Sequence, residues 1–184
     1  MPSQEAVLQW LMNEDTISRT QRTSRLQLIT DIYEEMSEGL EGVAFHGLLC
    51  KQAFEEARWS FVNGQFLSSV LLCQVVIDNT LRSGFRARGR GNTGLSDKDI
   101  LDLSYQDVVA KAHELSMLSD TERIECYWLK DVRNPYVHHR PTSRDYIAHR
   151  LLDESPSGIE DFQETDAGRA IRLMFSIVLR RWPF

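Results

Sequence analysis

Apolar residues recur every three or four positions along much of the chain, which is the spacing of amphipathic helices. The clearest stripes predict helices over residues 26–36, 48–63 and 66–81, and the third is the most apolar stretch of the sequence. We place this third helix at the centre of a bundle, with four core residues: Leu71, Leu72, Val75 and Val76. No segment alternates polar and apolar residues with the period of two that a half-buried strand requires. The pattern therefore predicts an all-α fold.

Capping and turn residues divide these helical stripes. The segments Ser104–Asp107 and Ser119–Glu122 each place an acid three positions after a serine, which is the pattern of a capping box at a helix start. Asn134-Pro135 is expected to interrupt or kink the helix that begins at Ser119–Glu122, because proline lacks the donor of an internal helical bond. A last helix is predicted from about Thr165.

Two stretches lack a clear helical stripe. Residues 13–24 are polar and indicate a turn or a weak helix, and residues 83–94 hold four glycines and three arginines with no expected order. The chain then divides into an N-terminal helical extension, residues 1–45, and a helical domain, residues 46–184. The acidic extension either packs on the bundle as an extra pair of helices or serves as an arm for dimerisation or for a partner.

Composition places the chain among globular proteins of one domain. It has 184 residues, of which 42% are hydrophobic and 26% charged, and this mix excludes a disordered tail or a fibre. No apolar run approaches the length of a membrane span, and the N-terminus lacks the pattern of a secretory signal. Three widely spaced cysteines fit buried thiols in a reducing compartment: Cys50, Cys73 and Cys126. We expect a cytoplasmic protein without membrane contact.

The balance of charges limits the classes of partner. A formal net charge of -6 argues against a protein that coats nucleic acids. Arginine nevertheless accounts for 17 of the 21 basic residues. Its planar fork grips phosphate or carboxylate at two points, so this bias suits anion binding and suits ordinary ion pairs equally.

Familiar cofactor and metal patterns are missing or misplaced. Gly89–Gly94 spells G-x-G-x-x-G, but a predicted helix precedes it where a dinucleotide site needs a strand. We interpret this segment as an arginine-glycine loop. The 5 histidines have no cysteine or carboxylate at a familiar metal-ligand spacing. The sequence therefore predicts no metal and no cofactor.

The segment Lys130–Arg140 concentrates chemically active residues. Arg133 offers a permanent cation for a phosphate, and Asn134 follows it directly. His138 or His139 offers an imidazole that gives or takes a proton near neutral pH. A cation beside an imidazole can cleave RNA without metal, because the RNA 2′-hydroxyl is itself the nucleophile. The alternative interpretation is structural, with these residues forming ion pairs at a helix end.

This segment resembles the R-polar-x(3–5)-H motif of the HEPN superfamily of helical domains. The stretch 57–66 is similar to the family's helix, glycine turn and following helix, and 75–82 is similar to its apolar helix ending on an acid and then Leu-Arg. The similarity covers residues 47–182. It implies an all-α, HEPN-like bundle of four main helices, here with additional N-terminal helices. The family usually dimerises, so that the Arg and His of both chains line one cleft.

The resemblance assigns roles by position. Arg133 becomes the phosphate-binding arginine, Asn134 the polar residue and Asp78 the acid that orients the arginine. Both His138 and His139 fit the motif, and we favour His138 because its four-residue gap is the commoner form. Many members of the family are metal-independent RNases of toxin–antitoxin or anti-phage systems. Others bind nucleotides, RNA or proteins without cleaving them.

A second group of arginines suits RNA binding: Arg82, Arg86, Arg88, Arg90 and Arg140. No acid lies between Arg82 and Arg90, and the glycines among them suggest a mobile clamp on an RNA backbone, with a solvated loop as the alternative. The sequence therefore predicts a homodimeric endoribonuclease that cleaves single-stranded RNA, with an antitoxin as a further partner. The competing hypothesis is a non-catalytic HEPN-like module that binds RNA, a nucleotide or a protein.

Overall fold

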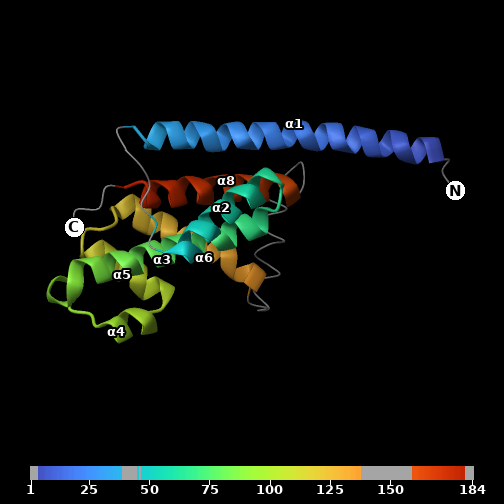
Figure 1. Ribbon diagram of the computed structural model, residues 1–184. Helices are drawn as coiled ribbons and strands as arrows, with labels where there is room; N and C mark the ends of the chain where they lie inside the picture. Colours follow the sequence, from blue (N-terminus) through green and yellow to red (C-terminus); the bar gives the residue numbers. More distant parts are fainter. Residues whose placement is uncertain (1–3, 39–44, 46, 138–158, 181–184) are drawn as a thin grey trace.

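Helices alone make up the regular structure of the described chain, which confirms the all-α prediction. The computed structural model describes residues 4–38, 45, 47–137 and 159–180. Within these ranges no strand occurs, and no helix is both long and apolar enough to cross a membrane. In chain order the helices (Figure 1) are α1 (Gln4–Met36), α2 (Leu48–Val62), α3 (Phe66–Thr93), α4 (Asp97–Asp102), α5 (Tyr105–Glu114), α6 (Asp120–Val137) and α8 (Ile159–Val178).

Helix α3 lies at the centre of the bundle, as predicted, and packs most extensively against α2 and α8. The residues assigned to its core are only partly right. Val76 is fully buried, Leu71 and Leu72 are half-buried, and Val75 is 45% exposed. The apolar run passes around the whole helix, so its sequence does not reveal which side faces inward. Tertiary packing buries Ile77 and positions further along α3 instead.

The arginine-glycine segment is helical, which overturns the expectation of a loop without order. Helix α3 continues to Thr93, and Gly89 interrupts its regular geometry with a φ of 72°. That left-handed conformation is the one in which glycine costs least. Gly84 is buried and has a different role, because a Cβ there would collide with the side chain of Met117. The glycines therefore allow a bend and a close contact, and they do not abolish the helix.

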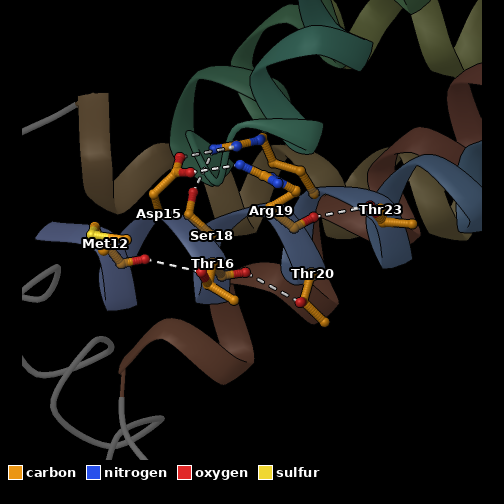
Figure 2. A network of polar contacts seen from close by, with 8 residues as sticks. Met12, Asp15, Thr16, Ser18, Arg19, Thr20 and Thr23 are labelled. Atoms are coloured by element: carbon orange, nitrogen blue, oxygen red, sulfur yellow. Dashed lines mark hydrogen bonds and ion pairs between the residues drawn. The ribbon is translucent and has the colours of Figure 1, made fainter. Parts of the chain in front are cut away.

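The polar stretch 13–24 is also helical, so α1 is one continuous helix of 33 residues. Figure 2 shows why the polar residues do not end it. Three threonine hydroxyls, those of Thr16, Thr20 and Thr23, donate to carbonyls four positions earlier at 2.9–3.2 Å. Arg19 donates to the Asp15 carboxylate at 2.8 Å. The polar side chains thus bond to the helix's own carbonyls or to one another, and of the two predicted alternatives, a turn or a weak helix, the helix is the one that forms.

The second half of α1 packs on α2 and α8, while its first half extends beyond the bundle (Figure 1). Ile29 and Ile32 are buried against the core. Arg25 is buried at the point where the helix leaves the bundle. It donates to both carboxylate oxygens of Glu164 at 3.0 and 2.9 Å, and its guanidinium lies 4.8 Å from the centre of the Phe66 ring.

Helix starts are the features that the sequence predicted best. The capping boxes of Ser104–Asp107 and Ser119–Glu122 both form, and a third forms at Ser96–Asp99 that the sequence analysis missed. Helix α6 passes through Pro135 and ends at Val137, so of the expected interruption or kink the interruption at Asn134-Pro135 does not occur. Helix α8 begins at Ile159, before the predicted start at Thr165.

Candidate functional site: a polar cavity between α3, α5 and α6

A polar cavity of about 470 Å³ opens between α3, the start of α5 and the end of α6. Two of the residues predicted to act on RNA, Arg133 and Asn134, lie in its wall. The full lining comprises Gln74 from α3, Ser104, Tyr105 and Gln106 from the α5 start, and Lys130, Arg133 and Asn134 from α6.

The phase of α6 places its polar residues at the cavity. Cys126, Leu129 and Val132 are buried and fix the inner side of the helix. Lys130 and Arg133 are three positions apart, so they share one face beside this buried stripe. Both side chains are half-buried. Two cations therefore project from one turn into the same polar space.

The guanidinium of Arg133 is held next to its neighbour in sequence. Its Nη1 donates to the Asn134 Oδ1 at 3.1 Å. The Lys130 ammonium lies 4.0 Å from an Asp131 carboxylate oxygen, at the outer limit of an ion pair. Positive charge thus faces a cavity whose remaining wall consists of amides and hydroxyls, an environment suited to a phosphate.

Buried polar atoms at the cavity wall lack ordinary hydrogen bonds. The Gln74 Oε1 and the Tyr105 hydroxyl are both buried without a partner of normal geometry. Burial raises the pKa of Tyr105 well above its ordinary value, and the neighbouring Cys126 and Asp78 raise it further. The tyrosine therefore stays protonated at neutral pH and keeps a donor.

The thiol of Cys126 does not supply a nucleophile. Burial raises its pKa to about 12, so the thiolate is scarce at neutral pH. All three cysteines are free and buried, as the sequence predicted.

Asp78 has a described partner other than the arginine it was expected to orient. Its Oδ2 accepts from the Nε of Arg82, one turn further along α3, at 2.8 Å. Its second oxygen is buried without a hydrogen bond. Its charge also contributes to the raised pKa of Tyr105.

The predicted RNA-binding arginines divide into two kinds. Arg82 donates to the carbonyls of Ile100 and Leu103, the second at 2.9 Å, and Arg88 donates to the carbonyl of Leu115 at 2.7 Å. These two side chains brace α3 against α4 and α5. Arg86 and Arg90 are exposed, and Arg86 lies 3.6 Å from the carboxylate of Asp97. Of the four arginines in this set that the structure describes, Arg86 and Arg90 retain the accessibility that an RNA clamp needs.

The remaining predicted site residues, His138, His139 and Arg140, lie outside the described residues. The structure thus describes Arg133 and Asn134 of the motif, and the role of His138 or His139 stays a prediction. Five residues of the cavity wall were not predicted as site residues: Gln74, Ser104, Tyr105, Gln106 and Lys130. Only Lys130 carried a usable signal, its helical spacing from Arg133.

No cluster of three or more potential metal ligands occurs among the described residues. Comparison with protein-family models, curated proteins and solved structures finds no match to this chain.

Proposed function

We propose that the polar cavity holds a phosphate of single-stranded RNA and that the protein is a HEPN-like, metal-independent endoribonuclease. The observation that carries the proposal is the pair of cations, Lys130 and Arg133, on one turn of α6 in the wall of the polar cavity. Asn134 adds an amide beside the guanidinium. A toxin or anti-phage role, a homodimer with two such sites facing one cleft, and an antitoxin as partner complete the proposal that the resemblance suggests.

In the proposed reaction, the RNA 2′-oxygen attacks its own phosphorus and the bond from phosphorus to the 5′-oxygen breaks. The products are a 2′,3′-cyclic phosphate and a 5′-hydroxyl. His138 or His139 moves the proton between the attacking and leaving oxygens. Arg133 stabilises the charge that develops on the phosphoryl oxygens in the transition state.

The test measures cleavage of a single-stranded RNA pool by the purified chain in EDTA. Arg133→Ala should abolish cleavage while the circular dichroism spectrum is unchanged, and Arg133→Lys should recover little, because an ammonium does not reproduce the two-point grip. The matched control on the same helix is Arg123→Ala, which removes an ion pair with Asp120 away from the cavity. This control should keep full activity.

Histidine variants then separate the two candidates for proton transfer. The catalytic histidine should lose about 10²–10⁴-fold in rate on substitution by alanine, and its neighbour far less. A wild-type protein that cleaves no RNA, or equal activity of Arg133→Ala and wild type, would contradict the endoribonuclease proposal.

A non-catalytic HEPN-like binding module is the second candidate, and one observation favours it. Arg82 and Arg88 are used to brace helices, which leaves fewer arginines for an RNA surface on a chain of net charge -6. Binding of labelled RNA that depends on Arg133, without cleavage, would support this candidate over the first.

A further inference from the structure

The first half of α1 is an isolated helix with exposed apolar residues. At about 1.5 Å per residue, the helix is on the order of 50 Å long. Among its side chains whose burial the structure describes, the buried ones begin at Arg25. Figure 1 shows the blue N-terminal half projecting past the ends of α2 and α8. Leu8 is 55% exposed and Met12 is 66% exposed on this projecting half. A lone helix of this kind gains stability when its apolar face is covered.

One face of α1 has the spacing of a coiled-coil seam. Its positions advance in alternating steps of four and three: Leu8, Met12, Asp15, Arg19, Arg22 and Leu26. This alternation keeps the side chains on one line along the helix, so they can face a single neighbouring helix. The two ends of the seam are apolar, and its middle carries one acid and two bases.

The seam leads directly into an open apolar groove on the bundle. The groove has a volume of about 320 Å³ and lies between the second half of α1, α2 and α8. Leu26 belongs to both the seam and the groove wall. Apolar and aromatic side chains, among them Tyr33 and Phe54, form most of the wall, and Thr30, Glu55 and Arg58 complete it. Each chain therefore presents an exposed apolar helix at one end of the seam and an open apolar groove at the other.

The charges of the seam select its partner and orientation. When two copies of α1 lie antiparallel with Leu8 opposite Leu26, Asp15 of each copy falls opposite Arg19 of the other. The same register brings Met12 against the aliphatic stem of Arg22. A parallel pairing would instead oppose Asp15 to Asp15 and Arg19 to Arg19, which costs energy. The seam is thus complementary to itself only in the antiparallel sense.

We infer that the partner of this surface is a second copy of the chain. Two chains associate antiparallel through the seam of Leu8 to Leu26, and the apolar N-terminal end of each α1 lies beside the groove of the other. This contact does not rest on the proposed function, because it uses α1, α2 and α8 while the polar cavity lies on α3, α5 and α6. The proposed dimer, in which two polar cavities face one cleft, can form at the same time. In that case the α1 contact joins one such dimer to another.

The first test compares two substitutions of equally exposed residues. Ile17 is 54% exposed, like Leu8, but nine positions along the helix place it about 180° away on the opposite face. Leu8→Asp should halve the mass that light scattering measures at tens of micromolar chain, through an increase of at least about tenfold in the dissociation constant. Ile17→Asp should leave the mass unchanged. An unchanged mass for Leu8→Asp, equal losses for both variants, or a monomeric wild type would each overturn the inference.

The second test uses charge reversal in full-length chains. Asp15→Arg places only bases in the middle of the seam, and Arg19→Asp removes one base and adds an acid. Each variant alone should lose the α1 contact, while an equimolar mixture should restore it, because the new Arg at position 15 faces the new Asp at 19 and Arg19 still faces Asp15. Circular dichroism of each variant should show the wild-type helix content. A mixture that associates no better than either variant would overturn the antiparallel register.

Discussion

Arg82 on α3 and Arg133 on α6 were both predicted from the sequence to contact RNA, but their surroundings in the fold differ. The side chain of Arg82 is 14% exposed and donates to a carboxylate and to two backbone carbonyls of another segment. Arg133 lines a polar cavity with Lys130 and donates to Asn134. An arginine whose donors reach distant backbone carbonyls stabilises the fold, whereas an arginine in a cavity wall can reach a ligand. The position of the guanidinium, against the backbone of another segment or in the wall of a cavity, distinguishes the two roles more than the residue type does.

The largest expected effect is the loss of the Arg82 brace. Arg82→Ala should lower the free energy of unfolding by about 2–4 kcal/mol, because it leaves a half-buried carboxylate and two carbonyls without their charged donor. Urea denaturation followed by circular dichroism measures this loss. Arg133→Ala in the same assay should cost less, because Arg133 lines an open polar cavity in which water can solvate the groups that the substitution exposes. Equal losses for the two variants would remove the distinction.

A second contact between distant segments, the ion pair of Glu122 with Arg180, should make the stability of the fold depend on pH. Burial raises the pKa of Glu122, but hydrogen bonds from Arg180 and Ser119 outweigh that effect and leave the pKa below its ordinary value. A lowered pKa in the folded state gives stability that is present above the ordinary pKa and is lost as pH falls through the folded value.

Glu122→Gln should therefore cost about 1–2 kcal/mol at pH 7 and progressively less as the pH falls below 4. Urea denaturation of the variant and the wild type at a series of pH values measures the difference. A constant difference between pH 7 and pH 3 would show that the carboxylate charge contributes nothing through Arg180.

Local signals account for the parts of the fold that the sequence predicted. A serine and an acid three positions apart suffice to start a helix, and all the predicted capping boxes form. The prediction that the glycine-rich segment 83–94 lacks order was wrong, because its helix depends on contacts with residues far away in the sequence. Arg88 binds a carbonyl beyond α5, and Gly84 accommodates Met117. Neither contact can be read from a window of neighbouring residues.

The candidate site shows the same limit. Arg133 and Asn134 could be chosen from the sequence because they are adjacent and chemically distinctive. Gln74 and Tyr105 come from two other helices, and only the packing of α3 and α5 against α6 brings them to the cavity. Asp78 was expected to orient Arg133. In the structure it accepts a hydrogen bond from Arg82, which lies one turn further along the same helix.

Substitution of Arg133 should have a small effect on the stability of the fold and a large effect on the binding of RNA. If Arg133 contacts one phosphate, Arg133→Ala should weaken the binding of a labelled single-stranded RNA and lower the slope of log affinity against log salt by about 0.7. Fluorescence anisotropy at several salt concentrations measures both quantities. A loss of affinity with no change in slope would mean that Arg133 acts on the fold of the cavity and not on a phosphate.

The exposed arginines of α3 should have the smallest effect on stability. Arg86 lies 3.6 Å from an Asp97 side chain that is 85% exposed, and such exposed pairs contribute little to stability. The double variant Arg86→Ala/Arg90→Ala should therefore change the free energy of unfolding by less than about 0.5 kcal/mol.

The same double variant also tests the RNA contact. If both arginines contact RNA phosphates, the slope of log affinity against log salt should fall by about 1.4, twice the change for one contact. Arg123→Ala, on α6 and away from the cavity, is the control with an unchanged slope. A double variant that binds like wild type at every salt concentration would confine the RNA contact to the polar cavity, and one that unfolds like Arg82→Ala would show that exposure does not separate the two kinds of arginine.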